Sequence, residues 1–417
     1  MATPLPQGAD IPAPTKSPAG PASPATPVYS AVARAYLDAA LDWIQQNSIR
    51  KNEIDWTAFR NKVWAYPRDA QTTEDTYPAI RYALTLLADG HGHLYTPEEA
   101  PPLQPAPAQG IGFTATYPER MVVAVDAVGS AGRAGVRVGD AITAIDGVAT
   151  APLTFEQFFA ALFAGTTTRL TLQRSGVAQP WTVTIGHDEY HYPAAAPAGR
   201  LMAGGIGYLA LPGNGSNSML GQYANYAQQL IRQIDQQGTC GWIVDLRDNG
   251  GGRLWPMLAG VGPILGQGLA GFFLRDGQTI PWGYRAGAVW YGDEVDQSVA
   301  QPYELRQPDP PVAILTNRYT VSAAEATEIA FGGRPATRHF GQPTAGAPNA
   351  PIRTQLSDGA VLQVAHTKEA DRTGHVYDGP IAPDQLIAVD QQLVGTDRDP
   401  TVLAASAWLR SQPGCAR

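Results

Sequence analysis

Two short apolar segments, each followed by a loop and a helical stretch, constrain the fold of this chain more than any other feature. The first is CGWIVDLRDN at residues 240–249, and the second is PVAILTN at residues 311–317. Continuous apolar runs of this length are typical of strands that are buried on both faces of a parallel sheet. The sequence therefore predicts an α/β core over residues 195–417, in which strands alternate with helices.

The part of the chain before this core divides into three regions. Residues 1–28 are rich in Pro, Ala, Ser and Gly, lack the basic and apolar segments of a signal peptide, and predict a disordered tether. Residues 29–105 carry apolar side chains at helical spacing and predict a helical region. Residues 106–190 contain several short β-type segments around one helical stretch, which predicts a compact, mostly β module.

The charge, the apolar runs and the cysteine count argue against several classes of function or site. The formal charge is −8 with only 29 basic residues, which argues against nucleic acid as a partner. No apolar run approaches the roughly 18–20 residues of a transmembrane segment. The two cysteines, Cys240 and Cys415, are too few for a structural zinc site. One disulfide between them is possible in an oxidising compartment.

Ser322 is the candidate nucleophile. It lies in ILTNRYTVSAAEATEIA (residues 314–330), just after a predicted buried strand and at the start of a predicted helix. Free N–H groups at a helix N-terminus can stabilise an oxyanion, and the N–H of Ala323 is well placed to do so. Serine is also a common N-cap residue, so a purely structural role is the alternative interpretation.

A glycine-rich loop follows the first apolar segment, in IVDLRDNGGG (residues 243–252). Three consecutive glycines allow the backbone to approach a substrate closely, and one of their N–H groups could complete an oxyanion hole with Ala323. A turn without chemistry is the alternative. A phosphate-binding loop is also conceivable, but no Gly-Lys-Ser/Thr follows.

Together with GQPTAG (residues 341–346), these segments resemble the tail-specific, or C-terminal processing, serine protease family. GIGF (residues 110–113) and AGRAGVRVGDAITAIDG (residues 131–147) are similar to the PDZ domain that this family carries before its catalytic core. The resemblance implies a crotonase-like αβ core, peptide-bond hydrolysis through an acyl-enzyme, protein or peptide substrates, and no cofactor or metal. It also implies a periplasmic or secreted location, and it assigns Gly251 to the oxyanion hole.

The catalytic base departs from the most familiar pattern of the family. Many members carry a lysine in a Thr-x-Gly-Lys-Gly loop, but residues 344–348 read Thr-Ala-Gly-Ala-Pro, and Ala347 cannot accept a proton. A second branch, similar to the tricorn core protease, uses a histidine in a segment like LADGHGHLY (residues 87–95). We therefore expect His91 to be the base, with His93 as the alternative, since histidine is mostly neutral near pH 7.

The histidine needs an acceptor that orients its ring, and two acids compete for this role. Asp378 lies in HVYDGPIAPD (residues 375–384), which resembles the segment that supplies an acid in the tricorn-like branch. Glu325 lies one helical turn after Ser322, although an acid in the first turn of a helix is also favoured by the helix dipole alone. Both acids are candidates for the partner of His91, and we favour Asp378 over Glu325.

The PDZ-like module is expected to bind peptide rather than to carry chemistry. Backbone N–H groups of its first loop would receive a substrate C-terminus, which would add as a strand. The residues of this predicted peptide-binding loop are Gly110, Ile111, Gly112 and Phe113. The competing functional hypothesis is a catalytically inactive member of the fold that binds peptides or apolar ligands.

Overall fold

The computed structural model describes most of the chain after the predicted tether. The described residues are 28–66, 68–99, 108–115, 120–125, 129–137, 139–153, 155–190, 196–214, 223–388, 393–394, 396 and 398–415. The predicted tether lies outside them, except for Val28. No described helix has the length and apolar character needed to cross a membrane.

The N-terminal region is helical, as predicted. Its elements are α1 (Ala31–Asn47), α2 (Trp56–Trp64), a 3-10 turn (Glu74–Thr76), α3 (Tyr77–Leu87) and the short strand β1 (His93–Tyr95). Side chains of Ser30 and Asp55 cap the first two helices by accepting backbone N–H groups. The apolar faces of the helices form one core that also takes in Leu362 and Val364 from the C-terminal half of the chain.

The α/β core is built on a six-stranded sheet with the order β10-β11-β12-β17-β18-β22. Its strands are β10 (Ala198–Met202), β11 (Ile206–Ala210), β12 (Gly241–Asp245), β17 (Val312–Thr316), β18 (Thr337–Gly341) and β22 (Gln385–Leu386). All pairs except β10 with β11 are parallel. This confirms the predicted buried parallel strands.

Helices cover both faces of this sheet. They are α6 (Tyr223–Asp235), α7 (Leu254–Leu265), α8 (Ala323–Phe331) and α9 (Pro400–Arg410). Side chains alternate along β12, so that Trp242 packs with α6, α7 and α8, whereas Ile243 packs with α9 on the other face. Because both faces are covered, every residue of β12 is buried.

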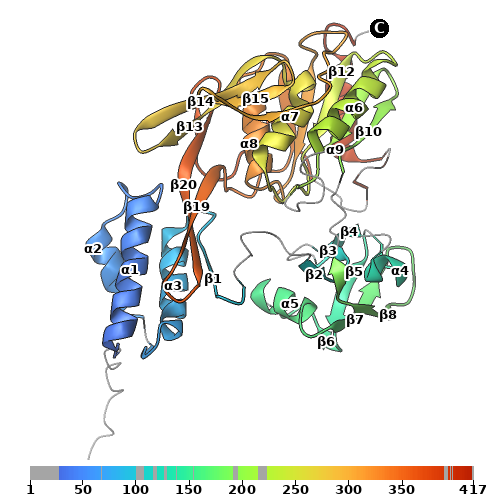
Figure 1. Ribbon diagram of the computed structural model, residues 1–417. Coiled ribbons are helices and arrows are strands. Elements are labelled where there is room, and N and C mark those ends of the chain that lie inside the picture. The colour runs from blue at the N-terminus through green and yellow to red at the C-terminus, as the bar shows by residue number, and fades with distance from the viewer. Residues whose placement is uncertain are drawn as a thin grey trace, which may run out of the picture.

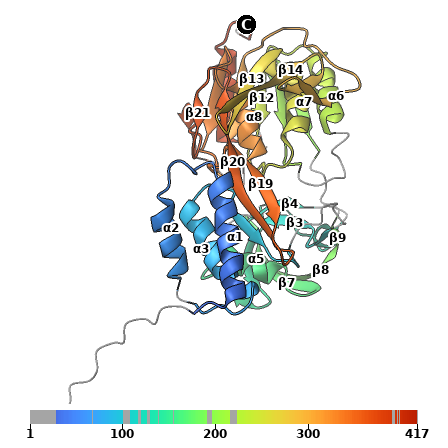
Figure 2. The same ribbon diagram turned by 60° about the vertical axis from the view of Figure 1, so that its left-hand side comes forward.

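A second sheet joins the core to the N-terminal helices. Besides β1, its strands are β13 (Gly268–Arg275), β14 (Gln278–Arg285), β15 (Ala288–Tyr291), β16 (Glu294–Ser298), β19 (Asn349–Gln355), β20 (Val361–Asp371) and β21 (Val376–Tyr377). The long strand β20 pairs with β13 at one end and with β1 at the other. Figures 1 and 2 show the β19–β20 hairpin running from the core down against α1 and α3. The predicted boundary between the helical region and the core is therefore bridged by a sheet.

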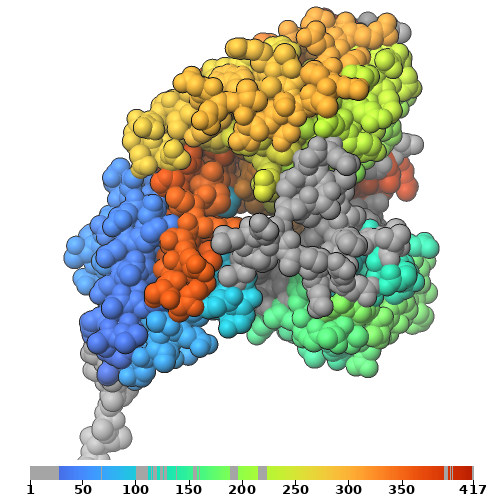
Figure 3. Space-filling model, in the orientation of Figure 1, coloured from blue at the N-terminus to red at the C-terminus, as the bar shows by residue number. Residues whose placement is uncertain are grey.

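The PDZ-like module has its own apolar core. Its elements are β2 (Ala108–Gly110), β3 (Phe113–Ala115), β4 (Val122–Val125), α4 (Ser130–Arg133), β5 (Ala141–Ile145), β6 (Val148–Ala149), α5 (Phe155–Leu162), β7 (Thr167–Gln173), β8 (Trp181–Gly186) and β9 (Asp188–Tyr190). Figure 3 shows this module and the N-terminal helices on opposite sides below the core.

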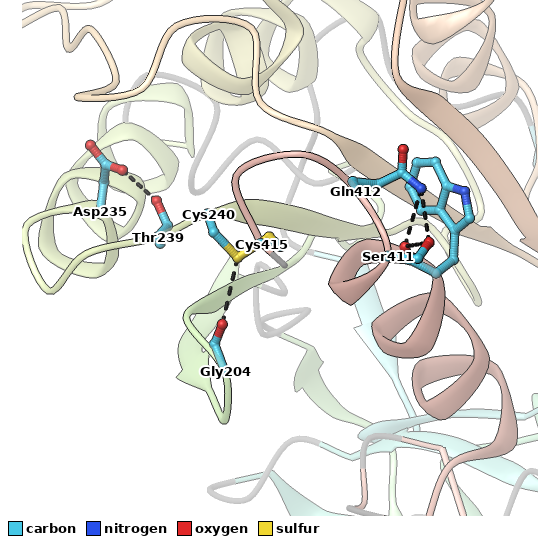
Figure 4. Close-up of a disulfide and its surroundings, with 8 residues drawn as sticks. Gly204, Asp235, Thr239, Cys240, Ser411, Gln412 and Cys415 are labelled. Atoms are coloured by element: carbon cyan, nitrogen blue, oxygen red, sulfur yellow. Dashed lines mark hydrogen bonds between the residues drawn. A yellow bond between two sulfur atoms is a disulfide. The ribbon is translucent and has the colours of Figure 1, made fainter. Parts of the chain in front are cut away.

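Helix α9 is fastened to the flanks of β12 at both of its ends. Cys415, after the helix, forms a disulfide with Cys240, directly before the strand, with their Cα atoms 5.0 Å apart (Figure 4). Asp399 caps the start of the helix and forms a buried ion pair with Arg247, at 2.8 Å. Arg247 also pairs with Asp245 at the end of β12. The disulfide that the sequence allowed is thus present and anchors the strand that leads into the glycine-rich loop.

Removing this disulfide should destabilise the protein without altering its architecture. The bond joins residues 175 positions apart, so its loss frees a long loop in the unfolded chain. We expect Cys415→Ser to lower the free energy of unfolding by about 2–5 kcal/mol, measured by denaturant unfolding. Reductant should destabilise the wild type and leave the Cys240→Ser/Cys415→Ser variant unaffected. Equal stability of wild type and variant under oxidising conditions would contradict the prediction.

Candidate active site

Ser322 sits on a strained turn between β17 and α8. Its backbone has φ 56° and ψ −116°, a conformation that residues with a side chain seldom adopt. The turn directs Oγ of Ser322 to within 3.0 Å of Nε2 of His91, although the two residues are 231 positions apart in the chain. The predicted nucleophile and the preferred base are therefore in hydrogen-bonding contact.

His91 lies in the loop between α3 and β1, and this loop is held by Asp89. Oδ1 of Asp89 accepts the N–H of His91 at 3.0 Å and that of Gly92 at 2.6 Å. Its Oδ2 accepts the N–H of Ala365 on β20 at 2.8 Å. The side chain of Gln363, also on β20, donates to the carbonyl oxygen of His91 at 2.7 Å. Strand β20 thus positions His91 in two ways, through the carboxylate of Asp89 and through the backbone carbonyl of His91 itself.

The position of the family lysine is filled by this loop. A Cβ atom placed on Gly90 would lie 3.0 Å from Cβ of Ala347, so the two small residues pack directly against each other. Gly90 also has φ +80°, which favours glycine. Lys368, the lysine nearest in sequence to that loop, instead forms an ion pair with Glu53 at 2.8 Å. Among the described residues, no lysine contacts Ser322.

His93, the alternative base, has its ring against Tyr95. It is exposed on β1, and its ring centroid lies 4.2 Å from that of Tyr95. Burial of part of the ring lowers the pKa of His93. No hydrogen bond joins His93 to Ser322 in the described part of the chain, so the geometry favours His91.

The expectation that Asp378 orients His91 is wrong for this structure. The Asp378 carboxylate is half exposed and forms ion pairs with Arg50 at 3.6 Å and with Lys368 at 3.7 Å. The ion pair with Arg50 joins the N-terminal region to the core at the surface. The segment HVYDGPIAPD, which matches the family motif imperfectly, therefore supplies a structural contact between regions of the chain.

Glu325 is near Ser322 but does not contact the histidine either. Its buried carboxylate accepts the N–H groups of Ser322 (2.8 Å), Gly346 (2.9 Å) and Ala347 (2.9 Å), together with the hydroxyl of Thr344 (2.5 Å). Four donors occupy both carboxylate oxygens. Glu325 therefore fixes the loop at residues 344–347 to the turn that presents the nucleophile.

The atom that contacts Nδ1 of His91 is Oδ1 of Asn349, at 2.6 Å. Asn349 is buried at the start of β19, and sequence reasoning missed it. The available signal was its position, since it follows directly after the Thr-Ala-Gly-Ala-Pro loop that was compared with the lysine motif. Both predicted partners of the histidine were acids, whereas Asn349 carries a neutral amide.

The two predicted oxyanion-hole donors differ in whether their N–H groups already have an acceptor. The N–H of Ala323 begins α8 and has no acceptor among the described residues. The N–H of Gly251 donates to Oδ1 of Asn249 at 2.9 Å. A Cβ atom on Gly251 would lie 3.1 Å from Cβ of Ser322, so this glycine does pack against the nucleophile. The backbone of Gly251 lies beside Ser322, but its N–H is engaged within its own loop.

In the PDZ-like module, the GIGF segment connects β2 to β3. Gly110 ends β2, and Phe113 begins β3 and pairs with Val125. The side chains of Ile111 and Phe113 are buried in the core of the module, and Gly112 packs against Ala131 at the start of α4. The side chains of this loop thus serve the core, which leaves backbone groups as its candidate ligand contacts.

Replacing Glu325 by glutamine should damage the site through the backbone. The amide can accept on one atom only, so some of the four donors would face an NH₂ group. We expect Glu325→Gln to lower the free energy of unfolding by about 1–3 kcal/mol and to slow reaction of Ser322 with a fluorophosphonate probe. Glu294→Gln, on the exposed strand β16, is the matched control. Unchanged stability and unchanged labelling would contradict this role.

Glu369 on β20 should make stability depend on pH. It is buried, its Oε2 has no hydrogen-bond partner among the described residues, and burial, reinforced by the charge of Glu325, raises its pKa to about 8. The folded protein therefore keeps a proton that the unfolded chain releases above about pH 4.5, so this group costs stability as pH rises from there to about 8.

Glu369→Gln removes that cost. We expect the melting temperature of the variant to exceed that of the wild type by a margin that grows between about pH 5 and pH 8 and is constant above that range. Thermal unfolding at a series of pH values measures it. A margin that does not change with pH would contradict the prediction.

Comparison with known proteins agrees with this architecture. Residues 205–387 match the model of peptidase family S41, and residues 121–174 match a PDZ domain. A carboxyl-terminal-processing protease of Synechocystis sp. is 28% identical over 355 residues, which cover 82% of this chain and 77% of that protein. The nisin-resistance protein of Lactococcus lactis subsp. lactis is 30% identical over 172 residues, or 41% of this chain and 52% of the relative. The chain thus spans about half the length of that relative.

Solved structures show the same fold. The photosystem II D1 C-terminal processing protease superposes with a TM-score of 0.56 at 22% identity, covering 88% of this chain and 95% of that protein. A lipoprotein from Streptococcus agalactiae gives a TM-score of 0.52 at 17% identity, covering 92% of this chain and 97% of that protein. These comparisons confirm the resemblance that the motifs indicated. Residues 205–387 thus carry a peptidase family S41 domain and residues 121–174 a PDZ domain, and the chain has the fold of a C-terminal processing protease.

Proposed function

We propose that this protein, which carries an S41 peptidase domain, is a serine peptidase that hydrolyses peptide bonds of protein or peptide substrates through an acyl-enzyme on Ser322. The observation that carries the proposal is the 3.0 Å contact between Oγ of Ser322 and Nε2 of His91 at the N-terminus of α8. A hydroxyl on a strained turn, beside an imidazole and at a helix N-terminus, is the arrangement that a nucleophilic serine needs.

The reaction follows from these contacts. Oγ of Ser322 attacks the scissile carbonyl carbon while its proton passes to Nε2 of His91. The protonated His91 then gives this proton to the leaving amine, and the peptide bond breaks to leave an ester on Ser322. A water molecule, deprotonated by His91, attacks that ester and releases the second product with regeneration of the hydroxyl.

The developing oxyanion would lie at the start of α8. The N–H of Ala323 and the positive end of the helix dipole favour negative charge there. The N–H of Gly251 would serve as the second donor after exchanging its bond to Asn249 for the substrate oxygen. The glycines that flank Gly251 make such a small backbone rotation inexpensive.

The PDZ-like module would capture the substrate before cleavage. In this proposal the GIGF loop receives a C-terminal carboxylate through its backbone N–H groups, and the peptide adds as a strand beside β3. Strand β3 pairs only with β4 among the described residues, which supports this role because its other edge has no strand partner there.

We also propose that the protein works in an oxidising compartment, such as a periplasm or an extracellular space. The Cys240–Cys415 disulfide supports this location, because structural disulfides persist where thiols are not kept reduced. The competing function is ligand binding by a catalytically inactive member of the fold. The contact between Ser322 and His91 favours catalysis, since a binding protein has no need of it.

Labelling with a fluorophosphonate probe tests the proposal. Ser322→Ala should abolish labelling, and His91→Ala should slow it by about 10²-fold or more because the general base is lost. His93→Ala is the matched control and should label at the rate of the wild type. Turnover of unstructured peptides should follow the same order.

Two results would overturn the assignment. Labelling that persists in Ser322→Ala would show that another residue is the nucleophile. A wild-type protein that binds peptides but neither reacts with the probe nor cleaves peptides would establish the binding function instead.

A further inference from the structure

The contact on the far side of the His91 ring determines how that ring can act. Asn349 is 7% exposed, and its Nδ2 donates to the carbonyl oxygen of Asp89 at 3.1 Å. A carbonyl oxygen only accepts, so the amide nitrogen must face Asp89. The amide oxygen is thereby directed to Nδ1 of His91, 2.6 Å away. The neighbouring backbone thus fixes which way the amide of Asn349 points.

This orientation selects one tautomer of the histidine. An amide oxygen cannot donate, so Nδ1 of His91 must carry the proton. Nε2 then presents its lone pair to the hydroxyl of Ser322 at 3.0 Å. That is the tautomer a general base requires, because the other one would point an N–H at the nucleophile.

The two carboxylates that hold the backbone around His91 and Ser322 are both occupied by other donors. Asp89 accepts three backbone N–H groups, and Glu325 on α8 accepts four donors. Glu369 on β20 is buried, and its Oε2 has no hydrogen-bond partner among the described residues. Arg50 donates to the carbonyl oxygen of Ala88, and His93 on β1 stacks on Tyr95. Among the described residues, no carboxylate oxygen is hydrogen-bonded to the ring of His91.

We propose that Asn349 is the positioning residue of a Ser322–His91–Asn349 catalytic group, in which a neutral amide takes the place that a carboxylate has in many serine peptidases. This inference rests on the proposed function, since it assigns how the base of that reaction is held. The side chain of Asn349 is hydrogen-bonded to His91 and to the backbone of Asp89, and not to Ser322, among the described residues. It acts by fixing the tautomer and the orientation of His91.

A neutral partner has a measurable consequence. It orients the ring but adds no negative charge to stabilise the imidazolium that forms when His91 accepts the proton of Ser322. A carboxylate at the same position would stabilise the protonated ring already in the free enzyme. The acidic limb of the kcat/KM profile therefore lies at lower pH with Asn349 than it would with aspartate.

The experiment compares full-length wild type with Asn349→Ala, Asn349→Asp and Gln355→Glu in peptide hydrolysis from about pH 5 to pH 9. Gln355→Glu is the matched control, because it makes the same change from amide to carboxylate on the same strand at an exposed position. Thermal unfolding of each variant is measured alongside.

Asn349→Ala should lower kcat by about 10²-fold with little change in KM, because the ring loses its orientation but the substrate contacts remain. Asn349→Asp should move the acidic limb up by about one pH unit or more, and Gln355→Glu should move it much less. Full kcat in a folded Asn349→Ala variant, or equal shifts in the two carboxylate variants, would overturn the proposal.

A spectroscopic measurement covers the case in which Asn349→Ala fails to fold. In ¹⁵N-histidine-labelled Ser322→Ala protein, the ring signals of His91, identified by their loss in a Ser322→Ala/His91→Gln variant, should report the Nδ1–H tautomer at neutral pH. The Nε2–H tautomer would overturn the proposal. Turnover that survives in Ser322→Ala would instead overturn the proposed function and leave the tautomer result standing.

Discussion

The pairing of strand β20 with two distant parts of the chain is the interaction on which the site depends. One end of β20 pairs with β13 in the core, and the other pairs with β1, directly after His91. Ala365 and Gln363 on this strand hold the Asp89–His91 loop through hydrogen bonds of 2.8 and 2.7 Å. Ser322 and His91 therefore meet only when the core and the N-terminal helices are joined by this sheet, which couples folding of the two regions to assembly of the catalytic pair.

Buried acids around the site shape the backbone rather than act on the histidine. Asp89 and Glu325 each gather backbone N–H groups from segments that carry a functional residue. A carboxylate satisfied in this way is stable in a buried position, because hydrogen bonds replace its lost hydration. The contact with the ring is left to Asn349, which adds no further charge to a region that already holds two carboxylates.

Sequence reasoning proposed the candidate residues that are tied to local structure, and two of them, Ser322 and His91, are in contact. A buried strand followed by a helix start identified Ser322, and the Asp-Gly-His sequence before the PDZ-like module identified His91. It failed for the orienting residue, because that contact depends on how β19 packs against the loop after α3. Asn349 has no periodicity or motif of its own, whereas Asp378 lay in a segment that matched the family only after a gap. The pairing of the two cysteines could not be predicted for a similar reason, because a separation of 175 residues in the sequence does not determine their distance in space.

The exchange of lysine for histidine is explained by one steric contact. Ala347 occupies the lysine position of the family loop, and its Cβ lies 3.0 Å from where a Cβ on Gly90 would be. A side chain extending toward the loop from residue 347 would displace residues 89–91, and with them the imidazole that contacts Ser322. A larger residue at position 90 would push the same loop away from the nucleophile and would also require an unfavourable backbone at φ +80°. The small pair Gly90 and Ala347 thus leaves room for His91 beside Ser322, and a lysine at residue 347 would compete with His91 for the same space.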